Sequence, residues 1–206
     1  MVITYFGKQY FKITQGDITI ALNPPSRDIV SKLKMPKFGA NIVLISTNHE
    51  NYNGAEISTF GDIIPFVING PGEYEIKGIS ITGFGEDVSL DSKKYINTTY
   101  LIDDGNLRVC FCGATSKELP TESREVIGDP DIILIPIGHV LISSRDAYKT
   151  AISFEPKIII PMDYEESDLR AFLKESGENK ITPIDKLTIK KKDLEGKDGE
   201  IVVLSY

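Results

Sequence analysis

The chain has 206 residues, and its 30 acidic side chains outnumber its 23 lysines and arginines, which gives a formal net charge of −7. Sequence-independent nucleic-acid binding needs a basic face, so no nucleic-acid partner is expected. The length suits one large domain or two small ones. Because no linker-like stretch interrupts the sequence, we expect one domain over residues 1–206.

No apolar run approaches the roughly 18 residues that a membrane span needs. The first residues also lack the charged-then-apolar pattern of a signal peptide. We therefore expect a cytoplasmic protein with no membrane partner.

The chain begins with three predicted strands. Apolar and polar residues alternate over residues 2–6, 10–13 and 18–22, with glycines at the turns. Pro24 and Pro25 follow the third strand and end it, because proline cannot donate to a strand ladder. Ser26 is then a candidate cap for a short helix.

Residues 41–54 are the stretch around which the rest of the chain is organised. The apolar run 42–45 indicates a buried strand, and it gives way abruptly to the polar loop 46–54. In open α/β sheets, ligand-binding side chains lie just beyond the C-terminal ends of strands, because the loops converge there on a crevice. This loop is therefore the first candidate for a functional site.

The strand and loop resemble the signature of the metallo-β-lactamase superfamily, an apolar strand that ends in Thr/Ser-His-x-His-x-Asp-His. Thr47 stands where the first histidine would be, and His49 keeps the second. Asn51 replaces the aspartate, and Tyr52 replaces the third histidine. A catalytic zinc needs about three imidazole, carboxylate or thiolate donors, and amide, hydroxyl and phenol groups are poor substitutes.

The Gly-Pro-Gly-Glu-Tyr-Glu segment, residues 70–75, carries a more specific resemblance. It is similar to the superfamily subset related to ascorbate-6-phosphate lactonase, which includes many metal-dependent hydrolases. A strand is predicted over residues 79–84, and in the family it leads to a loop with a metal-binding histidine. Glu86 and Asp87 occupy that place here.

A β-hairpin is predicted from two apolar runs, residues 97–102 and 107–112, around a turn rich in Asp, Gly and Asn. Cys110 and Cys112 point to the same face of its second strand, which disfavours a mutual disulfide. We interpret them as small core residues.

The exit of this hairpin is a further point of resemblance. Relatives carry His-Leu-Gly-Asp there, with the aspartate bridging two metals. In this chain Phe111 stands at the histidine and Ala114 at the aspartate, so the bridging carboxylate has become a methyl group.

The last third contains two more family positions. His139 ends the predicted strand segment 132–139, at a position where relatives usually have glycine, and Asp163 replaces the metal-binding histidine of a Pro-Met-His-Tyr strand end. Ser144 is a candidate helix cap. Other predicted elements are a short helix within residues 116–127, helices over 145–154 and 168–175, and strands over 157–164, 187–190 and 201–204.

These markers fall in family order along nearly the whole chain. The resemblance implies an α/β (α+β) fold, the four-layer αββα sandwich of the metallo-β-lactamase type, with a cleft along one edge. Composition and periodicity alone indicate only a mixture of helices and strands.

For function, two hypotheses remain. In the first, the chain is a non-catalytic descendant without a cofactor, whose cleft binds a small molecule or a protein, or supports an assembly; a homo-oligomer fits it. In the second, it is a hydrolase of phosphoesters, phosphodiesters or lactones, rebuilt around one divalent metal. The candidate ligands are then His49, Asp163, Glu86, Asp87 and His139, a set better suited to Mg²⁺ or Mn²⁺ than to Zn²⁺.

Individually, these side chains have simpler explanations. His49 suits a hydrogen bond to the loop backbone, His139 a surface position, and Asp163 a cap for the polar loop after it. Tyr52 and Phe111 are larger and more apolar than the groups they replace, so we expect them to fill part of the former metal pocket.

Overall fold

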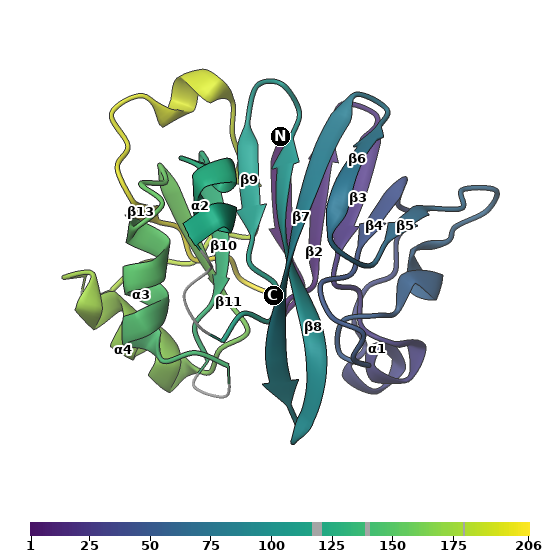
Figure 1. The fold of residues 1–206 in the computed structure, drawn as a ribbon, viewed down its shortest axis with the longest axis horizontal. Coiled ribbons are helices and arrows are strands. Elements are labelled where there is room, and N and C mark those ends of the chain that lie inside the picture. Colours follow the sequence, from purple (N-terminus) through teal and green to yellow (C-terminus); the bar gives the residue numbers. More distant parts are fainter. Residues whose placement is uncertain (117–120, 139–140, 179) are drawn as a thin grey trace.

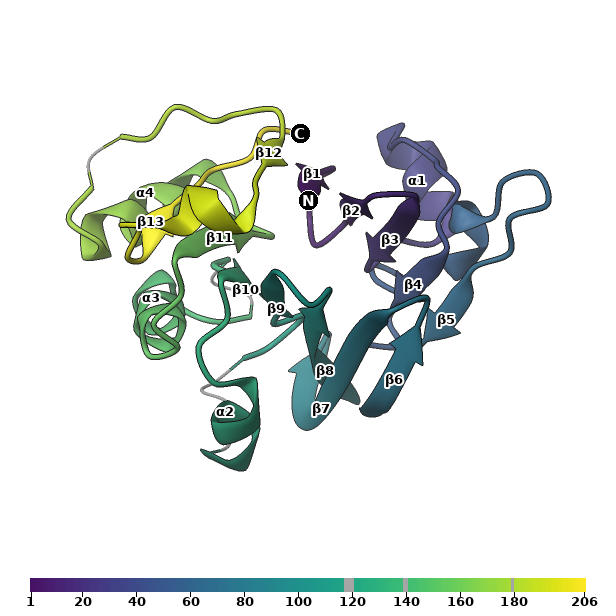
Figure 2. The same cartoon turned by 90° about the horizontal axis from the view of Figure 1, so that it is seen from above.

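The computed structural model describes residues 1–116, 121–138, 141–178 and 180–206 of the chain. Two β-sheets face each other, with helices on their outer sides (Figures 1 and 2). The first sheet has the strand order β12-β1-β2-β3-β4-β5 and the second β13-β11-β10-β9-β8-β7-β6.

The first sheet contains β1 (Val2–Tyr5), β2 (Phe11–Gln15), β3 (Ile18–Leu22), β4 (Ile42–Leu44), β5 (Phe66–Ile68) and β12 (Leu187–Thr188). The second contains β6 (Gly72–Ile76), β7 (Ile79–Leu90), β8 (Lys93–Asp103), β9 (Arg108–Phe111), β10 (Ile132–Pro136), β11 (Ile158–Met162) and β13 (Glu200–Ile201). The helices are α1 (Arg27–Leu33), α2 (Thr121–Ile127), α3 (Ser144–Ile152) and α4 (Glu166–Glu175), with 3-10 turns at Ala55–Ser58 and Lys191–Leu194.

Three apolar clusters hold the layers together. The largest lies between the two sheets and includes Phe11 from the first and Phe111 from the second. A second cluster packs the helices of the C-terminal half onto the second sheet, for example through Phe172. A third packs α1 onto the first sheet through Val30 and Val43. This arrangement confirms the predicted four-layer sandwich.

The segment after β4 connects the two sheets. The Thr98 amide donates to the Ser46 carbonyl at 2.7 Å, and Thr47 forms an isolated antiparallel bridge with Asn97. The chain therefore leaves the first sheet and pairs with β8 of the second. This pairing places the predicted site loop where the ends of both sheets meet.

β7 and β8 are longer than the strands predicted over residues 79–84 and 97–102, and the hairpin that they form extends beyond the other strands at the lower edge of Figure 1. We expected residues 85–87 to form a loop, and this is wrong. Glu86 pairs with Asn97 and Asp87 with Ile96 inside the hairpin. The alternation of buried Glu86, Val88 and Leu90 with exposed residues explains the longer strand.

The start of α3 also differs from the prediction. Ser143, not Ser144, is the N-cap, and its hydroxyl accepts a hydrogen bond from the Asp146 amide. The Ser144 hydroxyl instead donates to carbonyls of Ile137 and Asp168. Both Cys110 and Cys112 are buried free thiols, as predicted.

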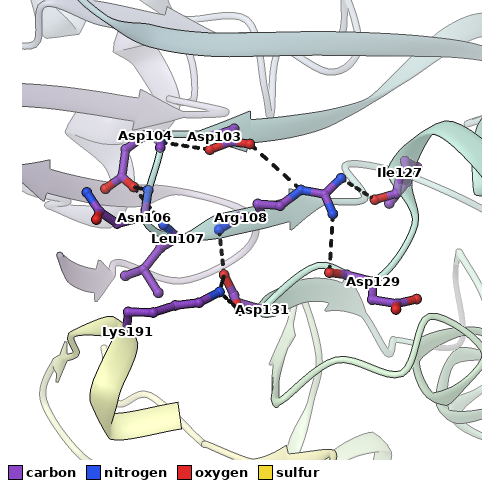
Figure 3. A network of polar contacts seen from close by, with 10 residues as sticks. Asp103, Asp104, Asn106, Leu107, Arg108, Ile127, Asp129, Asp131 and Lys191 are labelled. Atoms are coloured by element: carbon purple, nitrogen blue, oxygen red, sulfur yellow. Dashed lines mark hydrogen bonds and ion pairs between the residues drawn. The ribbon is translucent and has the colours of Figure 1, made fainter. Parts of the chain in front are cut away.

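A polar network braces the end of β9 that lies away from Phe111 (Figure 3). The Arg108 amide donates to Asp131 at 2.9 Å, and its guanidinium donates to the Ile127 carbonyl at 2.7 Å. Lys191 forms an ion pair with the same Asp131 carboxylate. Asp104 accepts from two amides of its own turn. The residues named in this network are not among those that line the cavity described next.

In the part of the chain described above, no helix is long and apolar enough to cross a membrane.

Candidate functional site

A cavity of about 630 Å³ lies at the end of the sandwich where the loops after β4 and β11 meet the tip of the β7–β8 hairpin. His49, Asn51 and Tyr52 line it from the first loop, and Asp163 lines it from the second. Its volume is within the range of small-molecule sites, about 300–1,000 Å³. The cavity therefore has the size and position expected of the family cleft.

A chain of hydrogen-bonded neutral side chains adjoins the start of the first cavity loop. Asn23 donates to Gln9 Oε1 at 2.9 Å and to Ser46 Oγ at 2.8 Å, and its own carbonyl oxygen accepts from the Ser46 amide. Ser46 Oγ lies 3.4 Å from Thr47 Oγ1, which donates to Asn97 at 3.1 Å. Hydrogen bonds thus link strands of both sheets through the positions where the family holds metal.

Asn97 is the centre of this network. Its amide nitrogen donates to Glu86 Oε1 at 3.1 Å and to the Cys112 carbonyl at 3.0 Å. Its carbonyl oxygen accepts from Thr47 Oγ1 and from the Ala114 amide at 2.7 Å. Two donated and two accepted hydrogen bonds use the full capacity of a carboxamide. Asn97 is also fully buried, so losing any of these bonds is costly.

Gly113 allows the backbone to approach this network. It has φ +60°, and a Cβ atom there would lie 2.4 Å from Ser46 Cβ and 2.5 Å from Asn97 Oδ1. Both the backbone conformation and the available space therefore require glycine.

Asp163 receives two hydrogen bonds from neutral donors. Gln9 Nε2 donates at 3.0 Å and the Tyr52 hydroxyl at 3.1 Å, and both bonds end on Oδ2. Burial, followed by the negative charge of Asp163, raises the pKa of Tyr52 well above its ordinary value. Tyr52 therefore stays protonated and donates this hydrogen bond to Asp163. A deprotonated phenolate bound to a metal would have no proton to donate.

The backbone of Asp163 is held in the left-handed region at φ +53°, which aspartate tolerates better than most residues. Its amide donates to the Tyr5 hydroxyl at 3.0 Å. A Cβ atom at Gly138 would lie 2.3 Å from the Asp163 carbonyl oxygen. The surrounding chain thus fixes this uncommon conformation, which aims the carboxylate at the cavity.

His49 makes a separate set of contacts. Its Nε2 lies 3.1 Å from Oδ2 of the exposed Asp91, and its Nδ1 accepts from the Asn51 amide at 3.3 Å. The ring lies edge-on to Tyr95 and tilted against Tyr52, with centroid separations of 5.6 and 5.8 Å. Both ring nitrogens therefore already have partners within the chain.

The predicted site residues fall into three groups. His49, Asn51, Tyr52 and Asp163 meet at the cavity. Thr47, Glu86 and Ala114 are buried, and each joins the Asn97 network through a side chain or amide. Asp87 is exposed on β7 and does not line the cavity, and His139 lies outside the described residues.

Tyr52 packs with Leu90 and Ala114 in a small apolar cluster beside the cavity. Phe111 does not take part, because its side chain lies in the central core, 6.5 Å from the ring of Phe11. The space near the former metal positions is therefore filled by Tyr52 and the network, not by Phe111.

The donors present do not fit a catalytic zinc. Within residues 1–116, 121–138, 141–178 and 180–206, no three His, Cys, Asp or Glu side chains are grouped so that they could hold a metal ion. The Asn97 network consists of amides and hydroxyls bonded to one another, together with the Glu86 carboxyl, which accepts from Asn97. Amides and hydroxyls are weak ligands compared with imidazole or carboxylate, and one carboxyl does not supply the three donors that a catalytic zinc needs.

Sequence reasoning missed Gln9, Asn23, Asn97 and Asp91. Asn23 stands where the family commonly has aspartate before proline, so that resemblance could have indicated it. Asn97 lies inside a predicted strand and Gln9 beside a turn, and no local pattern marks either as part of a site.

Taken together, the αββα layers and the strand-end cavity define a metallo-β-lactamase fold whose usual ligand positions carry a hydrogen-bonded network. The sequence matches the beta-lactamase superfamily domain over residues 2–163. The chain therefore belongs to the beta-lactamase superfamily. A search of curated proteins finds no significant match to it.

Solved structures with the same fold come from several organisms. A candidate Zn-dependent hydrolase of the metallo-beta-lactamase superfamily from Thermotoga maritima is 23% identical, with a TM-score of 0.74 and coverage of 98% of this chain and 97% of that one. A candidate metal-dependent hydrolase from Parabacteroides distasonis is 19% identical, with a TM-score of 0.63 and coverage of 92% of each chain. Igni18, a metallo hydrolase from Ignicoccus hospitalis, is 18% identical, with a TM-score of 0.63 and coverage of 92% and 99%.

Proposed function

We propose that this chain is a non-catalytic member of its superfamily, a pseudo-hydrolase whose cavity binds a small molecule. The observation that carries the proposal is the saturated Asn97 network at the former ligand positions. Each of its bonds would have to be exchanged before a metal could enter. The cavity above it remains open and mixes apolar and polar walls, as small-molecule sites do.

Replacement of a metal by a polar network preserves the architecture of the site. In the family, ligands from several strand ends converge on metal ions. Here the same strand ends are joined by hydrogen bonds among amides, hydroxyls and the Glu86 carboxyl group, so the buried polar groups of the network have partners within the protein. The scaffold and its cavity therefore persist without the ions.

We also propose descent from the subset related to ascorbate-6-phosphate lactonase. The Gly-Pro-Gly-Glu-Tyr-Glu segment supports this, and its glycine at position 72 has φ +147°, a conformation that side chains rarely adopt. A chain with one sandwich domain, located in the cytoplasm, fits the same proposal.

A second function deserves a test, because His49 and Asp163 both line the cavity. An imidazole and a carboxylate could contribute to a single Mg²⁺ or Mn²⁺ site in a hydrolase. Tyr52 opposes this, because its hydroxyl already occupies Asp163 Oδ2.

The test is hydrolysis of bis(p-nitrophenyl) phosphate and of a γ-lactone, with Mg²⁺, Mn²⁺ or Zn²⁺ added. The same assays are run on His49→Ala and Asp163→Asn, whose folding is checked by circular dichroism. We expect equal background rates for all three proteins. Metal-dependent turnover that both substitutions abolish would contradict the proposal and establish the single-metal hydrolase.

A further inference from the structure

The charged groups that line the cavity are mostly acidic. The described lining includes Asp91, Asp163, Glu165 and Asp168, against one lysine, Lys8. Asp91 pairs with His49, while Glu165 and Asp168 form the capping box of α4. The other three carboxylates thus have these roles within the protein, and Asp163 is the best candidate to bind a ligand.

Asp163 retains an oxygen for that ligand. Both of its hydrogen bonds come from neutral groups and end on Oδ2. Among the described residues, no ion pair joins Asp163 to Lys8 or to any other cation. Because both donors to this half-buried carboxylate are neutral, a cationic ligand beside it would gain a charge-assisted hydrogen bond.

Aromatic residues line the cavity that Asp163 lines. Phe6, Tyr52, Tyr164 and Tyr206 all line the cavity. Burial raises the pKa of Tyr164 to about 12, so this ring also stays neutral. Neutral aromatic faces attract cations and accept apolar groups. Aliphatic walls from Leu33, Met35 and Leu90 continue the apolar surface.

We propose that the cavity binds a small organic amine, with its ammonium group on Asp163 and its apolar body against the aromatic and aliphatic walls. The proposal rests on the binding function proposed above and specifies its ligand class. A primary ammonium fits better than a guanidinium, because a guanidinium prefers both carboxylate oxygens and Oδ2 is already taken.

The test compares three probes that share one apolar body and differ in charge: 4-phenylbutylamine, 4-phenylbutanol and 4-phenylbutyrate. Their Kd values for the full chain are measured by NMR titration at constant ionic strength. We expect the amine to bind about tenfold or more tightly than the alcohol, and the carboxylate to bind most weakly. This comparison needs no variant.

Asp163→Asn then locates the contact, because it removes the charge and keeps the shape. The amine should lose about tenfold in affinity, while the alcohol should not change. Asp87→Asn is the matched control, since it removes one exposed carboxylate of β7 outside the cavity. It should leave all three affinities unchanged.

Equal binding of the amine and the alcohol, preference for the carboxylate, or no binding by any probe would overturn the proposal. So would an equal effect of the two substitutions. None of these results would support the single-metal hydrolase, because the turnover assays test that hypothesis separately.

Discussion

Asn97 shows how one side chain can replace part of a metal centre. Its carboxamide joins Thr47, Glu86, Cys112 and Ala114 through four hydrogen bonds. A metal ion would organise the same strand ends through charge. The amide does so through bonds whose donors and acceptors are all used, so the site is complete without an ion.

Restoring two family ligands should therefore not restore the metal. Thr47→His with Asn51→Asp recreates two ligand positions, but Thr47 is 1% exposed and bonded to Asn97, and Tyr52 still occupies the third. After incubation with zinc and desalting, elemental mass spectrometry should find well below one zinc ion per chain. Stoichiometric zinc in the folded double variant would refute the interpretation that Tyr52 and the Asn97 network fill the former metal pocket.

Gly113→Ala should destabilise the fold more than a comparable glycine substitution. Gly113 and Gly105 both have positive φ, but only at Gly113 would the new Cβ clash with neighbouring atoms. We expect the free energy of unfolding in urea to fall by about 1–3 kcal/mol more for Gly113→Ala than for Gly105→Ala. Equal losses would mean that the network tolerates the intrusion.

At the scale of the elements, two helix starts give a matched pair. Ser143 caps α3 through its hydroxyl, whereas Ser26 stands at the N-cap of α1 without a side-chain hydrogen bond. Ser143→Ala should cost about 1 kcal/mol of unfolding free energy, and Ser26→Ala less, because only the first loses a cap bond. Urea denaturation of both variants measures the difference. A larger loss at Ser26 would contradict the assignment.

Most elements could be predicted because their apolar pattern is local. Strands such as β3 and β10 follow from continuous or alternating apolar runs. The extension of β7 to Leu90 was missed, since glycines and acidic residues interrupt its pattern.

Of the site residues, His49 and Asp163 were found through the family resemblance, whereas Gln9 and Asn97 gain their roles only from tertiary contacts.

At the scale of the whole molecule, buried tyrosines link folding to alkaline pH. Burial raises the pKa of Tyr5, Tyr10, Tyr52 and Tyr100 above the ordinary value. The folded state thus favours the protonated phenols, and unfolded tyrosine ionises near pH about 10. Their contribution to stability is present below that pH and is lost as the pH rises further.

We therefore expect the free energy of unfolding to fall steadily above pH about 10. In an alkaline titration, tyrosinate absorbance from these four residues should appear together with the loss of far-ultraviolet ellipticity. Full ionisation of every tyrosine while the ellipticity is retained would contradict the burial of these hydroxyls.

The pseudo-hydrolase assignment requires that a hydrogen-bonded network has replaced the metal centre. The most direct measurement is the metal content of the wild-type protein, purified without chelator and then saturated with Zn²⁺, Mn²⁺ or Mg²⁺ and desalted. Elemental mass spectrometry should find well below one ion of each metal per chain, because the described residues offer no group of three His, Cys, Asp or Glu side chains that could compete for a metal. Retention of about one ion per chain, lost in His49→Ala and Asp163→Asn, would show that these residues form a metal centre and would contradict the account.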